Sequence, residues 1–393
     1  MFSRSTTAST STWGDDVLED NDGLSLSSLQ KLACGELSPT HFDVSDIQRW
    51  EPGRFRFERM VQKAPRNKGQ VDHMFDVALG QHVAVKMVPD DWVCESHELF
   101  KLKFPCATEC PWVDLGISAF LMSIEYPYVC PLHGVYRSPQ DTMHIVTDLA
   151  SEGDLFDWST HLELSPGLER EASVMPLAKQ LMDAVRHLHD LQIVHRDLSM
   201  ENVLVTRGVG DDTPRIQLID FAMSSRERYV WGDDYGRPQY QAPEAHSGEM
   251  YDGFLSDAFA VGVVICSILT QEYLWASTRP GKCKIFDYYS ACGFTALAAR
   301  RKCFGRRLTL SQCMSEPVIR LLEGLLALSP ARRFNLGEDA GFRLGRGSLW
   351  QELSERSSTV ATKGACLRTP GHGGLRRIGS WASRGQPLPG SFH

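Results

Sequence analysis

Hydrophobic and polar residues alternate along the chain from Arg54 onward. Phe55 and Phe57 lie between charged residues, and a similar alternation returns over residues 71–79 and 82–88. A strand that buries one face shows this period of two. The pattern therefore predicts three strands joined by turns.

Farther along, apolar residues recur at the spacing of a helix. Leu177, Leu181, Val185 and Leu188 fall on one helical face. The run of residues 258–269 is more apolar, but it is about half as long as a helix that spans a bilayer. We therefore predict a buried core helix there and no membrane span.

The two ends of the chain differ in composition from the middle. Residues 1–53 mix Ser, Thr and Asp with short apolar clusters, and we predict a partly disordered N-terminal extension there. Residues 353–393 form a basic, Ser- and Gly-rich segment, in which no acidic residue follows Arg356. We predict a flexible tail, and for residues 375–380 we favour solvated disorder over a site that a basophilic kinase phosphorylates.

The composition is that of an ordinary globular protein, with 42% hydrophobic and 23% charged residues in a chain of 393. A net charge of −8 argues against a protein whose main task is to bind nucleic acid or anionic lipid, so we expect protein partners. The eleven cysteines form no CxxC pair, and the first residues match no secretory signal. We expect reduced thiols and a cytoplasmic or nuclear location. The oligomeric state is left open.

The segment HRDLSMEN, residues 195–202, resembles the catalytic loop of the protein kinase superfamily. Asp197 and Asn202 stand five residues apart, as they do in that family. The resemblance implies that Asp197 meets the proton of the attacking hydroxyl group, while Asn202 and Asp220 bind Mg²⁺. Asp220 opens Asp-Phe-Ala in the place of the family's Asp-Phe-Gly motif. Magnesium prefers oxygen donors and keeps waters, so these two ligands and the ATP phosphates suffice.

Upstream, VAVK at residues 83–86 resembles the strand whose lysine contacts the α- and β-phosphates. This similarity makes Lys86 the fourth expected catalytic residue, with Thr147 as the gatekeeper of the adenine site. Asp154 is expected to contact the ribose, and an ordinary surface residue is the alternative for it. The residues that the resemblance assigns to nucleotide binding are Gly69, Val71, Ala84, Lys86, Thr147, Asp148, Ala150, Asp154 and Leu204.

Residues 236–244 resemble the end of an activation segment, and the resemblance implies structural roles for Glu244, Asp257 and Arg333. Glu244 and Arg333 are expected to form a buried ion pair. Together the motifs imply an α+β, two-lobed protein kinase fold. Its expected parts are a small β-rich N-lobe at residues 54–147, a hinge at 148–150 and a larger α-helical C-lobe at 151–352.

Two departures from the family pattern concern the backbone around ATP. The loop at residues 64–69 keeps one of three family glycines, so we expect it to cover the phosphates less closely. Ala222 replaces the glycine of Asp-Phe-Gly, and a positive φ at this alanine costs about 1–2 kcal/mol. We expect this change to affect switching more than metal binding.

A third departure concerns the partner of Lys86. Gly116 and Ile117 stand where the family usually carries a helical glutamate. Asp114 is the nearest acidic candidate, and a shift of one helical turn would bring it opposite Lys86. A solvated aspartate near the start of a helix is the alternative.

The fourth departure concerns the substrate. Ser199 stands where serine/threonine kinases usually carry Lys and tyrosine kinases carry Ala. Tyr240 favours the serine/threonine class, although Arg237 replaces the Thr expected there. Two functions remain: an ATP- and Mg²⁺-dependent protein kinase acting on protein substrates, or a pseudokinase that binds nucleotide or acts as a scaffold. The presence of all four catalytic residues favours the kinase.

Arg196, beside the expected catalytic Asp197, requires a counter-charge. In related kinases a phosphate on the activation segment provides it. In this chain Asp233 and Asp234 lie in that segment, and we expect them to make the enzyme active without phosphorylation. Phosphatase treatment should therefore leave activity unchanged, and the Asp233→Asn/Asp234→Asn double substitution should lower it. Loss of activity after phosphatase, with an unaffected double variant, would point instead to Ser or Tyr residues of the segment.

Overall fold

The computed structural model describes residues 42–64, 69–208, 210, 213–231, 235–303 and 307–336. Most of the predicted N-terminal extension, the end of the predicted kinase domain and the whole predicted tail lie outside these ranges. Asp233 and Asp234 also lie outside them, so their predicted role stays a prediction.

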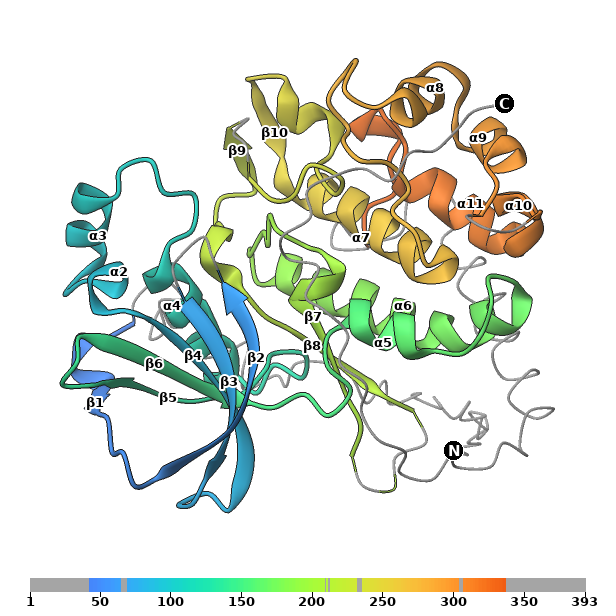
Figure 1. Cartoon of the computed structure of the whole chain (residues 1–393). Coiled ribbons are helices and arrows are strands. Elements are labelled where there is room, and N and C mark those ends of the chain that lie inside the picture. Colours follow the sequence, from blue (N-terminus) through green and yellow to red (C-terminus); the bar gives the residue numbers. More distant parts are fainter. Residues whose placement is uncertain are drawn as a thin grey trace, which may run out of the picture. The chain divides into compact units, whose positions relative to one another are not determined.

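One six-stranded sheet forms the first part of the fold, in the order β1-β5-β6-β4-β3-β2 (Figure 1). All neighbouring strands are antiparallel except β1, which runs parallel to β5. The three strands predicted from alternation are confirmed as β2, β3 and β4. The bounds are β1 Ile47–Arg49, β2 Phe55–Ala64, β3 Gly69–Asp76, β4 Gln81–Pro89, β5 Leu132–Arg137 and β6 Thr142–Asp148.

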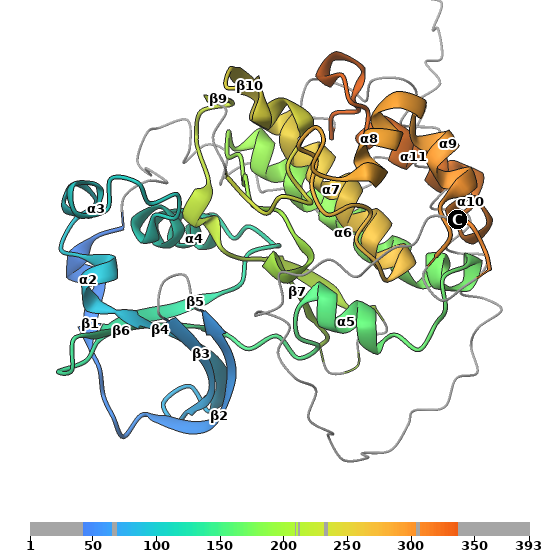
Figure 2. The ribbon, with the colours of Figure 1, turned by 45° about the horizontal axis from the view of Figure 1, so that its top comes forward.

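Three helices follow β4 and complete the N-lobe: α2 (Asp90–Val93), α3 (His97–Lys103) and α4 (Pro111–Ser123). Trp112 and Leu115 of α4 share one buried cluster with sheet residues that include Val88 and Ile145. Burying these side chains removes a large apolar area from water and fixes α4 against the sheet. Figure 2 shows α4 beside the sheet.

The C-lobe is mainly helical, and its predicted helix over residues 177–188 is confirmed within α6. Its helices are α5 Leu155–His161, α6 Leu168–Asp190, α7 Gly253–Thr270, α8 Lys284–Cys292, α9 Phe294–Arg300, α10 Leu310–Cys313 and α11 Glu316–Leu325. Two short antiparallel ladders accompany them: β7 (Val203–Thr206) with β8 (Arg215–Leu218), and β9 (Tyr229–Trp231) with β10 (Met250–Asp252).

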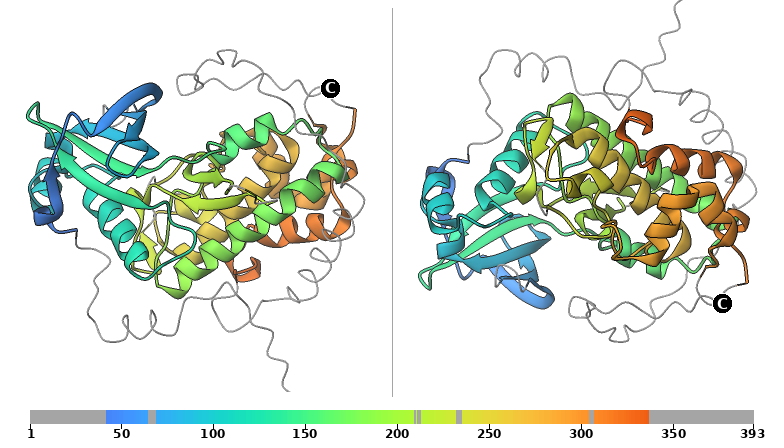
Figure 3. Two further views of the ribbon diagram at one scale, coloured as in Figure 1. Left: turned by 90° about the horizontal axis from the view of Figure 1, so that it is seen from below. Right: turned by 90° about the horizontal axis from the view of Figure 1, so that it is seen from above.

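Helix α7 is the one helix in the described part of the chain that is long and apolar enough to cross a membrane. However, 94% of that apolar window is buried inside the protein, as in the core helix of a globular domain. The helix packs against α6, and Figure 3 shows the two from opposite sides. The prediction of a buried core helix at residues 258–269 is therefore confirmed.

Asp257 of α7 fixes the backbone that precedes the candidate catalytic aspartate. Its Oδ2 accepts a hydrogen bond from the backbone N–H of His195 at 2.7 Å, and its Oδ1 accepts one from the N–H of Arg196 at 3.0 Å. Its Oδ2 also lies 3.1 Å from Nε2 of His189. Because the carboxylate is 2% exposed, these bonds replace its lost hydration and hold the loop in one position.

Arg333 and Glu244 form the predicted buried pair between the end of the activation segment and the last described residues. The Arg333 side chain is fully buried, and its Nη2 donates to Glu244 Oε2 at 2.8 Å. The guanidinium also donates to the backbone carbonyl groups of Leu255 and Ala327. The charge is thus paired and hydrogen-bonded, as a buried charge must be.

Replacing Arg333 with Met should lower the free energy of unfolding by about 3–5 kcal/mol, because Glu244 is left as a buried charge without its partner. Urea unfolding followed by circular dichroism measures this change. Arg332→Met is the matched control, since Arg332 is exposed and its loss should change stability by less than about 0.5 kcal/mol. Equal losses in the two variants would contradict a stabilising role for the buried pair.

Candidate active site

The candidate catalytic residues Asp197 and Asn202 are joined by hydrogen bonds. Asn202 Nδ2 donates to the Asp197 carboxylate at 3.0 Å and to the Asp197 backbone carbonyl at 2.8 Å. Both residues are buried, with exposed fractions of 5% and 4%. Because the amide nitrogen of Asn202 points to Asp197, the amide oxygen remains as the atom that can bind a cation.

Asp220 lies beside Asn202 because the β7–β8 ladder brings their neighbours together. Val203 pairs with Leu218, and the N–H of Ile219 donates to the backbone carbonyl of Asn202 at 3.1 Å. Asp220 has a φ of 66°, in the left-handed region that non-glycine residues rarely adopt. Strained conformations of this kind cluster at functional sites.

The donors that Asn202 and Asp220 present fit a magnesium ion. A carboxylate and an amide oxygen are the hard ligands that Mg²⁺ prefers, and waters and phosphate oxygens normally complete its shell. Among the described residues there is no cluster of three or more His, Cys, Asp or Glu side chains arranged to hold a metal.

Asp114 connects Lys86 with the segment that follows Asp220. One oxygen, Oδ2, lies 3.9 Å from Lys86 Nζ, and the other, Oδ1, accepts the N–H of Phe221 at 2.9 Å. The sequence left two alternatives for Asp114, a partner of Lys86 or a solvated residue at a helix start. The geometry places it opposite Lys86. Its side chain is 16% exposed, so it is not a solvated aspartate.

The pKa values of this pair reflect opposing effects. Burial raises the pKa of Asp114 most, the nearby Lys86 lowers it, and Asp220 raises it again, with a result of about 6. Burial lowers the pKa of Lys86, but the carboxylates of Asp220, Asp114 and Glu109 raise it by more. Lys86 therefore stays protonated, and Asp114 becomes a full counter-charge above about pH 6.

Ala222 replaces the glycine of Asp-Phe-Gly, but its backbone has no positive φ and therefore no strain of that kind. It lies in the 3₁₀ helix η3 (Phe221–Met223), and the positive φ of this motif falls on Asp220 instead. Its carbonyl accepts the N–H of Cys110, the residue that caps α4, at 2.8 Å. The cost expected for a positive φ at Ala222 is therefore absent in this conformation.

Most of the predicted nucleotide-binding residues lie on strands β3, β4 and β6 or just after β6, while Asp154 caps α5 and Leu204 lies in β7. Val71 pairs with Lys86, Ala84 with Thr147, and Asp154 forms an isolated bridge with Leu204. Asp148 and Ala150 end β6 and begin the connection to α5, and Gly69 is the first residue of β3. The register thus places Val71 beside Lys86 and Ala84 beside Thr147, and the roles of all nine residues in nucleotide binding stay a prediction.

Two of the predicted nucleotide-binding residues also have structural partners. The Asp154 carboxylate accepts the N–H of Asp157 at 2.8 Å and so caps α5, while burial raises its pKa to about 7. The Asp148 carboxylate lies 2.6 Å from Nε2 of His133, and its backbone N–H donates to Pro131. The backbone carbonyl of Asp148 also accepts hydrogen bonds, from the Thr147 hydroxyl at 3.3 Å and the Cys130 thiol at 3.6 Å. A ribose contact by Asp154 stays a prediction.

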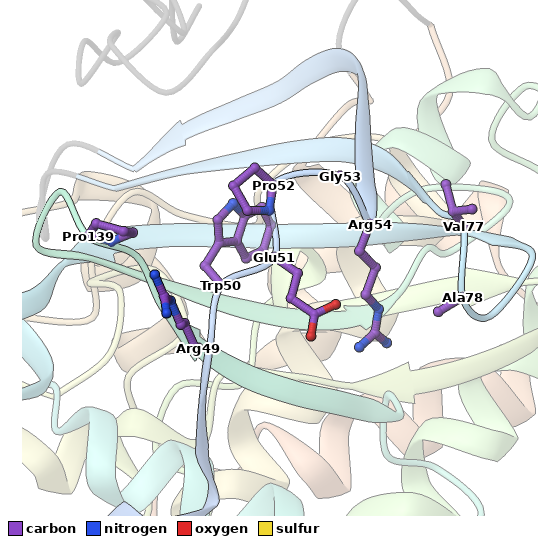
Figure 4. A pocket seen from close by; sticks show the side chains of 9 residues that line it. All are labelled: Arg49, Trp50, Glu51, Pro52, Gly53, Arg54, Val77, Ala78 and Pro139. Atoms are coloured by element: carbon purple, nitrogen blue, oxygen red, sulfur yellow. The ribbon is translucent and has the colours of Figure 1, made fainter.

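A hollow of about 690 Å³ is lined by residues of the N-lobe (Figure 4). It includes the turn that precedes β2 and contains none of the predicted nucleotide-binding residues. A much smaller cavity of about 10 Å³ lies behind Lys86 and Asp114. The residues that line the large hollow are Arg49, Trp50, Glu51, Pro52, Gly53, Arg54, Val77, Ala78 and Pro139.

The structure also shows contacts that the sequence did not indicate. Arg237 Nη1 contacts Ser199 Oγ and lies 2.8 Å from Glu201 Oε2, so an arginine of the activation segment lies on the catalytic loop. The Arg196 guanidinium lies 3.4 Å from the ring centroid of Tyr235. One sequence signal for the first contact existed: Ser199 and Arg237 are both unusual for the family, and the two departures occur together.

The comparison with known proteins agrees with these motifs, since residues 67–338 match the protein kinase domain family. CBL-interacting serine/threonine-protein kinase 17 of Arabidopsis thaliana is 29% identical over 57% of this chain and 48% of its own length. CBL-interacting protein kinase 1 of Oryza sativa subsp. japonica is 30% identical over 55% of this chain and 43% of its own length. The chain therefore spans about half the length of the curated relatives it matches.

The pKa of Asp114 provides a direct test of its contact with Lys86. In protein labelled with ¹³C at the aspartate carboxyl groups, the resonance that Asp114→Asn removes should titrate near pH 6. Lys86→Met should raise this pKa further, because the lysine charge favours the ionised carboxylate. Lys103→Met is the control, since Lys103 pairs with Asp91 and its loss should leave the titration unchanged. A pKa near 4 that does not respond to Lys86→Met would contradict the contact.

Proposed function

The chain belongs to the protein kinase family, and from this premise we propose that it is an ATP- and magnesium-dependent serine/threonine protein kinase. The observation that carries the proposal is the ion pair between Lys86 and Asp114, whose second oxygen binds the N–H of Phe221. This contact holds the phosphate-binding lysine next to the metal-binding Asp220. Asp197 and Asn202 lie beside that aspartate through the β7–β8 ladder.

The proposed reaction is an in-line transfer of the γ-phosphoryl group of ATP. The oxygen of the protein hydroxyl forms a bond to the γ-phosphorus, and the bond from that phosphorus to the β,γ-bridging oxygen breaks. The electron pair of the broken bond leaves with ADP, and the hydroxyl proton goes to Asp197. A carboxylate in this position also orients the hydroxyl group before attack.

The other residues position the charged groups. Lys86 binds the α- and β-phosphates, and Asp114 keeps the lysine in place. Asn202 and Asp220 would hold Mg²⁺, which supplies positive charge that offsets the charge of the phosphates. Asn202 has a second task, because its amide group fixes the Asp197 carboxylate at 3.0 Å. Preorganised groups of this kind lower the barrier because they need not reorganise during the reaction.

Serine and threonine are the proposed acceptors, and protein chains the proposed substrates. Relatives that match the chain carry the name serine/threonine-protein kinase. Tyr240 supports the same class from the sequence, and its hydroxyl accepts the backbone N–H of Met200 at 3.3 Å. We also propose a cytoplasmic or nuclear location, which is supported by the free thiols of all the cysteines in the described residues.

A pseudokinase is the second candidate, and the observation that favours it is the loop at residues 64–69 with its single glycine. The replacement of glycine by Ala222 no longer favours a pseudokinase, because Ala222 has an ordinary backbone conformation. The two candidates differ in a simple measurement, namely transfer of labelled phosphate from Mg-ATP to a protein substrate. Phosphoamino-acid analysis of the product then reports the acceptor.

Asp197→Asn should lower the rate of phosphoryl transfer by about 10²–10⁴-fold, because the amide cannot accept the hydroxyl proton. Binding of Mg-ATP, measured by calorimetry, should remain close to that of the wild type. The substitution keeps the size of the side chain, so a folding defect is not expected. Transfer at the wild-type rate by this variant would contradict the assignment of Asp197. Absence of transfer by the wild-type protein itself would favour the pseudokinase.

A further inference from the structure

The catalytic loop, residues 195–202, carries no lysine, but an arginine from the activation segment, Arg237, lies against it. Arg196 is the one basic residue besides His195 in residues 195–202, and its guanidinium lies over the ring of Tyr235. A second guanidinium reaches the loop from another segment. Arg237 Nη1 contacts the hydroxyl of Ser199 and binds Glu201 Oε2 at 2.8 Å.

The backbone of the activation segment holds Arg237 in this place. The Arg237 carbonyl accepts the N–H groups of Tyr240 and Gln241 at 2.9 and 3.3 Å. Gly236 has a φ of 78°, and a Cβ atom there would lie 2.8 Å from the carbonyl oxygen of Arg196 and 3.4 Å from Asp197 Oδ1. The segment therefore lies against the catalytic aspartate, and only glycine fits at the point of contact.

The carboxylates that act on the charge of Arg237 belong to the catalytic loop and the Asp-Phe-Ala motif. Burial lowers the pKa of its guanidinium, but Glu201 raises it, followed by Asp197, and Asp220 adds a smaller increase. Both acids that flank the expected γ-phosphate thus act on this arginine. Its side chain is 25% exposed and that of Glu201 is 31% exposed, so the pair is partly open to solvent.

Arginine is suited to two tasks at once. The guanidinium carries five N–H donors in a planar fork, and Nη1 alone serves both Ser199 and Glu201. During phosphoryl transfer, charge spreads over the equatorial oxygens of the γ-phosphate. A cation already held near these oxygens stabilises that charge without further reorganisation.

We propose that Arg237 is a catalytic residue that contacts the transferred γ-phosphoryl group and provides the positive charge that Ser199 does not. The inference rests on the proposed kinase function and names a further residue of the same reaction. Glu201 orients the arginine in this arrangement. The competing role is that Arg237 only neutralises Glu201, and the two roles predict different results for paired substitutions.

Arg237→Gln should lower kcat by about 10²–10³-fold and change KM for Mg-ATP by less than about threefold. Binding of the non-hydrolysable ATP analogue AMP-PNP should weaken by no more than the same threefold, and binding of ADP, which has no γ-phosphoryl group, should not change. Arg228→Gln is the matched control. Arg228 lies in the same segment, is 23% exposed and pairs with Asp252 at 2.9 Å, so its loss should change kcat by less than about threefold.

Two double variants separate the roles. Ser199→Lys/Arg237→Gln returns a cation to the loop and should recover at least about tenfold of the lost kcat. Glu201→Gln/Arg237→Gln removes the acid as well and should recover none of it. Arg237→Lys keeps the charge without the fork, so it should retain more activity than Arg237→Gln and serves as the test if that variant does not fold.

The inference is overturned if Arg237→Gln retains kcat within threefold of the wild type, or if Glu201→Gln/Arg237→Gln restores activity. In the second case Arg237 acts only as the counter-charge of Glu201. A wild-type protein that neither binds Mg-AMP-PNP nor transfers phosphate overturns the proposed function and the inference together. An active wild type with an unaffected Arg237→Gln overturns the inference alone.

Discussion

The carboxylate of Asp114 joins the two halves of the candidate active site. It contacts Lys86 on the sheet with one oxygen and the backbone N–H of Phe221, next to Asp220, with the other. An aspartate is one methylene shorter than the glutamate that the family usually carries, so the backbone must come closer. The structure achieves this approach through the N-terminus of α4, where Cys110 donates its N–H to the carbonyl of Ala222. The position in the first helical turn also favours the ionised carboxylate.

Much of the fold follows from local patterns in the sequence. Helical spacing from Leu177 to Leu188 predicts the middle of α6, because that helix must bury one face. Alternation at Phe55 and Phe57 correctly predicts strand β2, although only Phe55 is buried and Phe57 is exposed. The site residues in the catalytic loop could be predicted for a similar, local reason. Asp197 and Asn202 are five residues apart, so a short loop fixes their relative position without help from distant segments.

Contacts between distant segments were harder to predict. Arg237 and Ser199 are separated by 38 residues, and their contact depends on the path of the whole activation segment. The sequence showed two unusual residues but not that they touch. The stacking of Arg196 on Tyr235 depends on the same path. For Asp114, the sequence left two alternatives open because the outcome depends on how the start of α4 packs against the segment after Asp220. That packing includes the tertiary hydrogen bond from the N–H of Cys110 to the carbonyl of Ala222.

A double-mutant cycle on Lys86 and Asp114 tests most directly whether this carboxylate holds the site together. Asp114→Asn removes the charge but retains an oxygen that can accept the N–H of Phe221, so the cycle isolates the ion pair. If the pair acts as one unit, the double variant with Lys86→Met should transfer phosphate no more slowly than Lys86→Met alone, with a coupling energy of about 1–3 kcal/mol. Independent effects, in which the two losses of rate multiply, would contradict the account.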